Sequence, residues 1–343
     1  MMQTKESLKN LNPYRPTKTR PTIKLDANES DNFLFSDGLK LEEVAVNLYP
    51  DSEASALKAR LAEESGVPSE SILVGSGSSE LIELVIKTYM NPGDTVLSID
   101  PTFGLYEIYT TIHGGNYETV PLNNAFDLDM ERFIQEADTL DPAIIILCSP
   151  NNPTGKLIDQ DAIRRLLKKT DAIVLLDEAY IDFSGEGESM KREVLDYPNL
   201  LVARTFSKAY GMAGARLGYM FADKTVAENL RSVKTPYSVN ALSQALGVKA
   251  LEDPEKVKMH CEAVAERRET LKDKLRSLRL KTLDSATNFL YVLSDDERLR
   301  EKLLKYDIAI RAYKGTTPAS YRITVGSTIE NRLLIGALKE VLK

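Results

Sequence analysis

The chain has 343 residues, of which 43% are hydrophobic and 28% charged, a composition typical of globular proteins large enough for two domains. This composition excludes whole-chain disorder, a collagen helix and a long coiled coil. The 51 Asp and Glu residues outnumber the 44 Lys and Arg residues, and the net charge is -7. That excess of negative charge disfavours binding to nucleic acid or to an anionic membrane.

Two cysteines and two histidines are too few for a disulfide framework or a cysteine-rich metal site, so we expect no metal. The start of the chain is polar and lacks the apolar core of a secretory signal. No apolar run approaches the ~20 residues that a membrane-spanning helix needs. These features indicate a soluble protein of a reducing compartment, which we expect to be the cytoplasm.

The first thirty residues are expected to form an extended arm. Their prolines disfavour helix, because proline removes a backbone donor and restricts the residue before it. The pattern then predicts a helix over residues 56–64, a short strand over 72–75 and a strongly apolar helix over 81–90.

Short aliphatic runs bounded by helix-breaking residues follow along the chain. Such runs are typical of strands that are buried on both faces of a parallel sheet. A helical pattern over residues 159–169 lies between two of them, and this alternation predicts an α/β architecture with right-handed crossovers. The predicted strands cover residues 95–99, 143–148, 172–177, 200–203 and 217–221.

The pattern changes after Pro236, where long helical segments replace the short aliphatic runs. We therefore predict three parts: an N-terminal arm (1–30), a large domain (31–235) and a small α+β domain (236–343). The small domain is expected to contain helices over 241–251, 255–278 and 330–342, and strands over 289–293, 308–311 and 321–325.

The segment between Thr205 and Arg216 carries the densest group of chemically useful side chains. Lys208 follows a predicted buried strand, and ligands bind beyond the carboxyl ends of strands in open parallel sheets. Apolar neighbours and a second cation would lower the pKa of Lys208 and leave an amine able to form a Schiff base. Thr205, Ser207 and Arg216 fit one phosphate group. The alternative is a surface lysine in a glycine-rich loop.

Asp177 ends the apolar strand predicted over residues 172–177. A buried carboxylate without a partner is costly, so Asp177 should face a cation, for which a protonated pyridine nitrogen would serve. Tyr180 is placed to donate to a phenolate oxygen nearby. The alternative role for Asp177 is a helix N-cap.

Two further polar segments lie at predicted strand ends. Asn152 belongs to Asn-Asn-Pro-Thr-Gly at 151–155, which follows the strand over 143–148. Gly-Ser-Gly-Ser-Ser-Glu at 75–80 precedes an apolar helix, whose exposed N–H groups and positive end predict an anion site.

In this order, the four segments resemble the motifs of the fold-type-I pyridoxal-phosphate aminotransferases over nearly the whole chain. Within that group the sequence is most similar to the histidinol-phosphate aminotransferases, through its compact length and the segments 12–14, 25–29, 48–51, 101–103 and 321–326. The resemblance implies a large domain with a mostly parallel, seven-stranded sheet sandwiched by helices, and a smaller α+β domain.

The resemblance also implies roles for individual residues. Lys208 would form the Schiff base with pyridoxal 5'-phosphate and move the proton, Asp177 would pair with the pyridine nitrogen, and Tyr180 would assist at the phenolic oxygen. The other cofactor-binding residues would be Ser78, Ser79, Phe103, Asn152, Thr205, Ser207, Arg216 and, from the second subunit of a homodimer, Tyr49. The substrate-binding residues would be Tyr14 of the partner's arm, Asn28, Arg311 and Arg322.

The activity implied is transfer of an amino group between L-histidinol phosphate and 2-oxoglutarate, in histidine biosynthesis. An aminotransferase for aromatic or other amino acids, and a decarboxylase of threonine phosphate, remain as alternatives on the same scaffold. A non-catalytic cofactor-binding module is disfavoured, because every catalytic position is kept. Cys148 is expected in the core, His113 at a helix end, and His260 on a solvated helix face.

Overall fold

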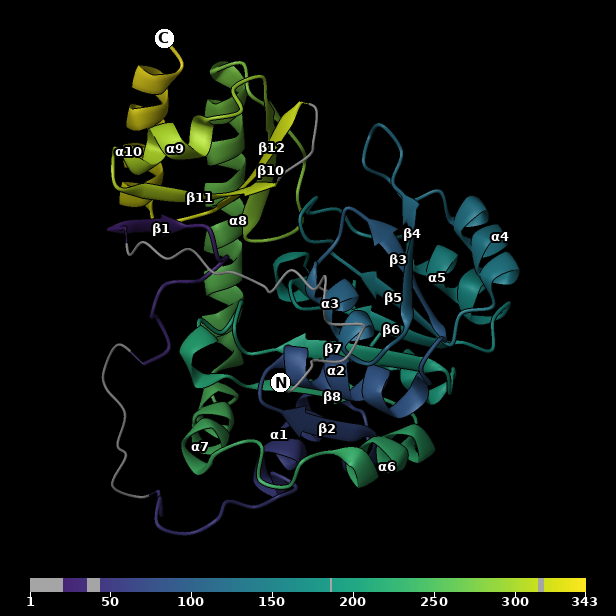
Figure 1. The fold of residues 1–343 in the computed structure, drawn as a ribbon. Helices are drawn as coiled ribbons and strands as arrows, with labels where there is room; N and C mark the ends of the chain where they lie inside the picture. Colours follow the sequence, from purple (N-terminus) through teal and green to yellow (C-terminus); the bar gives the residue numbers. More distant parts are fainter. Residues whose placement is uncertain (1–20, 36–43, 186, 314–317) are drawn as a thin grey trace, which may run out of the picture.

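The computed structural model describes residues 21–35, 44–185, 187–313 and 318–343 (Figure 1). These residues form a seven-stranded sheet and a separate five-stranded sheet, with helices against both. The predicted α/β architecture, with a mostly parallel seven-stranded sheet, is confirmed.

The seven-stranded sheet has the strand order β2-β8-β7-β6-β5-β3-β4. Only β8 is antiparallel to its neighbours, β2 and β7; the other pairs are parallel. All five residues of β5 are buried, as expected for an aliphatic strand covered on both faces. The strands are β2 (Ile72–Gly75), β3 (Thr95–Asp100), β4 (Asn116–Pro121), β5 (Ile144–Cys148), β6 (Ile173–Asp177), β7 (Leu200–Thr205) and β8 (Gly218–Phe221).

Helices cover both faces of this sheet. One face packs against α2 (Ser78–Tyr89), α3 (Leu105–Ile112) and α6 (Lys224–Val233). The other face packs against α1 (Ser55–Ser65), α4 (Met130–Leu140) and α5 (Gln160–Leu167). Single-turn 3₁₀ helices occur at Ser69–Ser71, Ile181–Phe183, Glu193–Leu195 and Ala213–Ala215.

The five-stranded sheet has the order β1-β11-β12-β10-β9. Its first strand comes from the predicted arm: β1 pairs in parallel with β11, which lies at the other end of the sequence. The strands are β1 (Ile23–Leu25), β9 (Lys281–Thr282), β10 (Phe289–Ser294), β11 (Ile308–Tyr313) and β12 (Ala319–Thr324). The accompanying helices are α8 (Pro254–Ser277), α9 (Leu299–Leu304) and α10 (Thr328–Val341).

The helix α7 (Ala241–Ala250) packs against α1, below the small sheet in Figure 1. Gly247 makes this close approach possible, since a Cβ there would lie 3.0 Å from Cδ2 of Leu57 on α1. The helix follows the proposed boundary at residue 236 and yet contacts the large sheet's helices. The division into arm, large domain and small domain stays a prediction.

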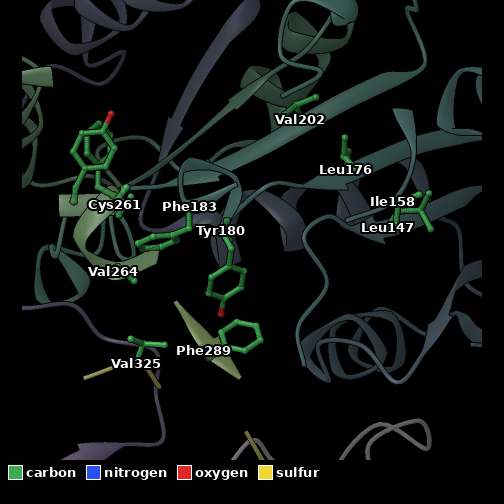
Figure 2. Close-up of a cluster of buried hydrophobic side chains, with 14 of the residues drawn as sticks. Leu147, Ile158, Leu176, Tyr180, Phe183, Val202, Cys261, Val264, Phe289 and Val325 are labelled. Atoms are coloured by element: carbon green, nitrogen blue, oxygen red, sulfur yellow. The ribbon is translucent and has the colours of Figure 1, made fainter. Parts of the chain in front are cut away.

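A shared hydrophobic core joins the two sheets (Figure 2). Tyr180, which follows β6, points toward Phe289 of β10, and the two rings meet edge to face with centroids 5.0 Å apart. Val264 of the long helix α8 belongs to the same core. This contact places the end of β6 beside the small sheet, where the polar residues described next are found.

Candidate active site

Lys208 lies three residues beyond the end of β7, in a partly buried position. Its Nζ donates a hydrogen bond to the carbonyl oxygen of Ala27, at 3.0 Å. Burial lowers the pKa of Lys208 to about 7, and the nearby cations Arg322 and Arg216 act in the same direction. A lysine in this environment supplies a neutral amine near neutral pH, unlike an ordinary surface lysine.

Asp177 ends β6 and is only 4% exposed. Its Oδ2 accepts a hydrogen bond from the hydroxyl of Tyr106 at 2.7 Å, and its Oδ1 accepts one from the backbone N–H of Ala179 at 3.2 Å. Burial raises the pKa of Asp177, while these two hydrogen bonds and the charge of Lys208 act against that rise. No α-helix begins at Asp177, so the alternative prediction, that Asp177 is a helix N-cap, is wrong.

Tyr180 connects the carboxylate region with the lysine. Its hydroxyl oxygen accepts a hydrogen bond from Nδ2 of Asn28 at 3.0 Å, and Nζ of Lys208 lies 5.7 Å from the centre of its ring. Burial raises the pKa of Tyr180, so the hydroxyl keeps its proton and remains a donor. Asn28 is itself fully buried and held by Thr324 of β12 and by Asn288, which directly precedes β10.

Arg322 of β12 reaches into the same region from the small sheet. Its Nη1 donates to Oδ1 of Asn152 at 2.6 Å, and its Nη2 donates to the carbonyl oxygen of Asp26 at 2.9 Å. Its Nε is buried and has no hydrogen-bond partner among the described residues. Arg311 is the cross-strand neighbour of Arg322 on β11. Two guanidinium groups on adjacent strands favour an anionic ligand.

The start of α2 forms a cradle of backbone N–H groups. Gly77 precedes the helix with φ 80°, and a Cβ on it would lie 2.7 Å from Nη2 of Arg216, so the guanidinium packs directly on this turn. Ser78 and Ser79 are the first two helical residues. A Cβ on Gly218 would lie 2.3 Å from the backbone nitrogen of Ser78. The positive helix end and the arginine together suit a phosphate group.

Thr205 and Ser207 border this cradle where β7 ends, and both are buried. The backbone N–H of Ser207 donates to Oγ1 of Thr205 at 3.1 Å. Thr205 is paired across the sheet with Gly218. The two hydroxyls therefore lie on the same sheet edge as the start of α2.

Sequence reasoning overlooked Tyr106, which lies on α3 and is fully buried. Phe103, expected to stack on the cofactor, meets the ring of Tyr106 edge to face with centroids 5.6 Å apart. A tyrosine three residues after Phe103 in an apolar helix gives no sign that its hydroxyl reaches Asp177, because the contact spans 71 positions.

Two of the predicted residues are not found near Lys208 and Asp177 in the described part of the chain. Tyr49 is 83% exposed, and its ring stacks on that of Tyr237 with centroids 4.8 Å apart. Tyr14 lies outside the described residues.

The histidines and cysteines have other environments. Cys148 is buried and His113 caps the end of α3, both as predicted. The prediction for His260 is wrong: its ring stacks on Phe33 with centroids 4.0 Å apart, because the chain after β1 covers this part of α8. Within the described residues, no three His, Cys, Asp or Glu side chains gather as metal ligands would, and none of the helices could span a membrane.

Comparison with known proteins gives concordant results. The sequence model of the family "Aminotransferase class I and II" matches residues 15–338. A histidinol-phosphate aminotransferase of Clostridium kluyveri is 34% identical over 347 residues, covering 99% of this chain and 98% of the relative. The crystal structure of histidinol-phosphate aminotransferase from Sinorhizobium meliloti, in complex with pyridoxal 5'-phosphate, has a TM-score of 0.86 at 25% identity and covers 94% of this chain and 91% of that one.

A further solved structure has the same fold with a different activity in its name. The L-threonine-O-3-phosphate decarboxylase from Porphyromonas gingivalis has a TM-score of 0.80 at 24% identity, covering 93% of this chain and 99% of that one. At this identity the likeness extends to the fold alone. From the family match over nearly the whole chain, this protein belongs to the class I and II aminotransferases and is a transaminase that uses pyridoxal 5'-phosphate.

Proposed function

We propose that this enzyme transfers the amino group of L-histidinol phosphate to 2-oxoglutarate, a reaction of histidine biosynthesis. The observation that carries the proposal is the environment of Lys208: its amine donates to the carbonyl oxygen of Ala27 at 3.0 Å, its charge acts on the buried carboxylate of Asp177, and burial and Arg322 lower its own pKa to about 7. A base (Lys208), a negative charge (Asp177) and an anion-binding group (Arg322) therefore belong to one site. The names of relatives that are similar over nearly their whole length support the choice of substrate.

The residues present fit pyridoxal 5'-phosphate. The turn at Gly77 has no room for a Cβ beside Arg216, which is the close packing that a phosphate cradle needs. The buried carboxylate of Asp177 has hydrogen-bond donors but no cationic hydrogen-bond partner among the described residues, and a protonated pyridine nitrogen would fill that place. Ser78, Ser79, Thr205, Ser207 and Arg216 would hold the phosphate, Phe103 would stack on the ring, and Asn152 and Tyr180 would contact its phenolic oxygen.

The protein's own contribution to the reaction is positioning and proton transfer. When bound, pyridoxal phosphate withdraws electrons from the carbon that carries the substrate's amino group. Asp177 keeps the pyridine nitrogen protonated through its negative charge. Lys208 takes the proton from that substrate carbon with its neutral amine, and a pKa of about 7 keeps much of the amine ready for this step.

Arg322 would bind the anionic end of either substrate, with Arg311 and Asn28 assisting. A guanidinium can donate two parallel hydrogen bonds to a phosphate monoester or to a carboxylate. Asn152 and the carbonyl oxygen of Asp26 hold that fork in place before substrate arrives, so little side-chain freedom is lost on binding.

We also propose that two copies of the chain form a homodimer in which Tyr14 and Tyr49 complete the partner's site. Support comes from Tyr49, a large aromatic side chain that is almost fully exposed beside Val46 and Leu48, which are exposed as well. A cytoplasmic location is part of the proposal, supported by two free, buried cysteines.

The substrate is tested with the purified, cofactor-loaded enzyme and one amino donor at a time. Histidinol phosphate is expected to convert the absorption of the pyridoxal form into that of the pyridoxamine form, and 2-oxoglutarate to reverse it. Conversion by phenylalanine but not by histidinol phosphate would refute the substrate assignment. Release of carbon dioxide from threonine phosphate, without need for 2-oxoglutarate, would instead identify a decarboxylase.

The lysine and the dimer are tested with variants. Lys208→Ala is expected to lose the visible absorption band of the loaded enzyme; a band that persists would refute the role of Lys208. Mixing inactive Lys208→Ala subunits with Tyr49→Ala subunits is expected to restore activity, because each hybrid dimer then holds one site with both side chains. No restoration in a mixture shown to exchange subunits would refute the shared site.

A further inference from the structure

A short segment after β1, residues 26–33, contacts both the backbone and the side-chain amine of Lys208. We call this segment the strap. The hydroxyl of Ser30 donates to the backbone carbonyl oxygen of Lys208 at 2.8 Å, and the carbonyl oxygen of Ala27 accepts from Nζ of the same lysine at 3.0 Å. In Figure 1 the strap is the purple trace that leaves β1 and approaches α8. One segment therefore contacts both the backbone and the amine of Lys208.

The fit between the strap and the lysine loop is close. Gly211, whose N–H also donates to the carbonyl oxygen of Lys208, has φ 65°, and a Cβ on it would lie 2.7 Å from the carbonyl oxygen of Asp31. A side chain at position 211 would push the strap away. The strap and the loop are therefore in backbone-to-backbone contact, which leaves Ser30 little freedom to choose another acceptor.

Other contacts fix the strap itself. Nδ2 of Asn288 and the side chain of Thr324 hold Asn28 from the small sheet. On the other side, Phe33 stacks on His260 of α8, and Arg267 of the same helix donates to the carboxylate of Asp31 at 3.3 Å. Because the strap is attached at both ends, the hydrogen bond from Ser30 transmits a fixed position to the lysine rather than following it.

We propose that Ser30 is a positioning residue for the amino-group transfer: its hydroxyl fixes the backbone of Lys208, so that the amine alone moves between the carbonyl oxygen of Ala27 and the reacting carbon. The proposal rests on the function proposed above for Lys208. A proton-transferring amine works only within a narrow range of positions, and small displacements reduce rates strongly. Ser30 touches neither substrate nor cofactor in this scheme and acts only through the lysine.

The proposal predicts a separation of kinetic constants. Ser30→Ala is expected to lower kcat by about 2- to 12-fold, the range that loss of one neutral hydrogen bond gives, with KM for both substrates unchanged. Ser30→Thr keeps a hydroxyl and is expected to restore kcat. Ser277→Ala is the matched control, because its hydroxyl also donates to a backbone carbonyl oxygen, that of Lys274 at 2.7 Å, on the exposed end of α8.

A second measurement does not depend on activity. In the full chain freed of cofactor, trace labelling with an amine-reactive anhydride at a series of pH values gives the titration midpoint of Lys208 by peptide mass spectrometry. The wild-type midpoint is expected at about 7. In Ser30→Ala the backbone of Lys208 is held less firmly and its amine is better hydrated, so the midpoint is expected to rise above the wild-type value, in the direction of 10.5.

The outcomes distinguish a failure of this proposal from a failure of the function proposed for Lys208. A Ser30→Ala enzyme with wild-type kcat and wild-type midpoint, or a Ser30→Thr enzyme as slow as Ser30→Ala, would overturn the role of Ser30. A lower melting temperature with unchanged kcat and midpoint would assign Ser30 a structural role and overturn it as well. Failure of the function proposed for Lys208 is seen separately, as a visible band that persists in Lys208→Ala.

Discussion

The hydroxyl of Tyr106 is expected to control the charge of Asp177, and Tyr106→Phe tests this directly. The hydrogen bond spans 2.7 Å in a fully buried setting, and its acceptor is a carboxylate. A hydrogen bond to a charged group contributes about 1.5–3 kcal/mol. Its loss is therefore expected to destabilise the carboxylate form of Asp177 by this amount and to raise the pKa of Asp177 further.

The consequence is a weaker counter-charge for the pyridine nitrogen. In the cofactor-free variant, more Asp177 is protonated at a given pH, so affinity for pyridoxal 5'-phosphate is expected to fall, and to fall most at the acidic end of the range. A loss of about 1.5–3 kcal/mol corresponds to a rise in the dissociation constant of up to about 10- to 100-fold at the acidic end. Binding followed by absorbance or fluorescence between about pH 5 and pH 8 measures this loss.

Tyr321→Phe provides the control. Tyr321 is also buried and its hydroxyl donates to the carbonyl oxygen of Asp296 at 2.6 Å, but Tyr321 belongs to β12 of the five-stranded sheet. Its removal is expected to lower stability without changing cofactor affinity. Equal affinities for wild type and Tyr106→Phe across the pH range would refute the reasoning, as would an equal loss in both variants.

Three further changes follow from the geometry. Gly77→Ala places a Cβ 2.7 Å from Nη2 of Arg216 at φ 80°, and displacement of the guanidinium is expected to lower affinity for pyridoxal 5'-phosphate about tenfold, which a fluorescence titration measures. Between pH 7 and 10.5 the unfolded chain binds more protons at Lys208 than the folded chain does, so the free energy of unfolding of the cofactor-free protein should rise with pH there; in Lys208→Met, denaturant unfolding should show a smaller rise. In the middle of α10, the Cβ of Gly336→Ala meets no atom of the described residues within 4 Å, and a gain of about 0.5–1 kcal/mol in the free energy of unfolding is expected in the same assay.

The elements that the sequence predicted best are those whose burial follows from their own residues. Each residue of β5 and nearly all of β6 are buried, so an unbroken aliphatic run was a sufficient signal. The edge strand β4 escaped prediction because most of its residues are exposed and its pattern is polar. The strand β1 has only three residues and exists through pairing with β11, a contact that no local pattern contains.

The same distinction applies to the site. Lys208, Asp177 and Asn152 were recognisable because each follows a strand in a short motif, and the structure brings the three into one region. Tyr106 and Ser30 were not recognisable, since the hydroxyl of each contacts a residue far away in the sequence. The stacking of Phe33 on His260 was missed because these two residues are also far apart in the sequence, and the histidine was predicted to face solvent.

The reversed direction of β8 restricts how this enzyme can vary in length. Gly218 lies between Gly75 on β2 and Thr205 on β7, so the connection that carries Lys208 and Arg216 starts and ends at two residues that are paired across the sheet, Thr205 and Gly218. An added residue there would part the amine from the guanidinium or shift the strand register. Natural insertions should therefore accumulate elsewhere, for instance around the exposed edge strand β4.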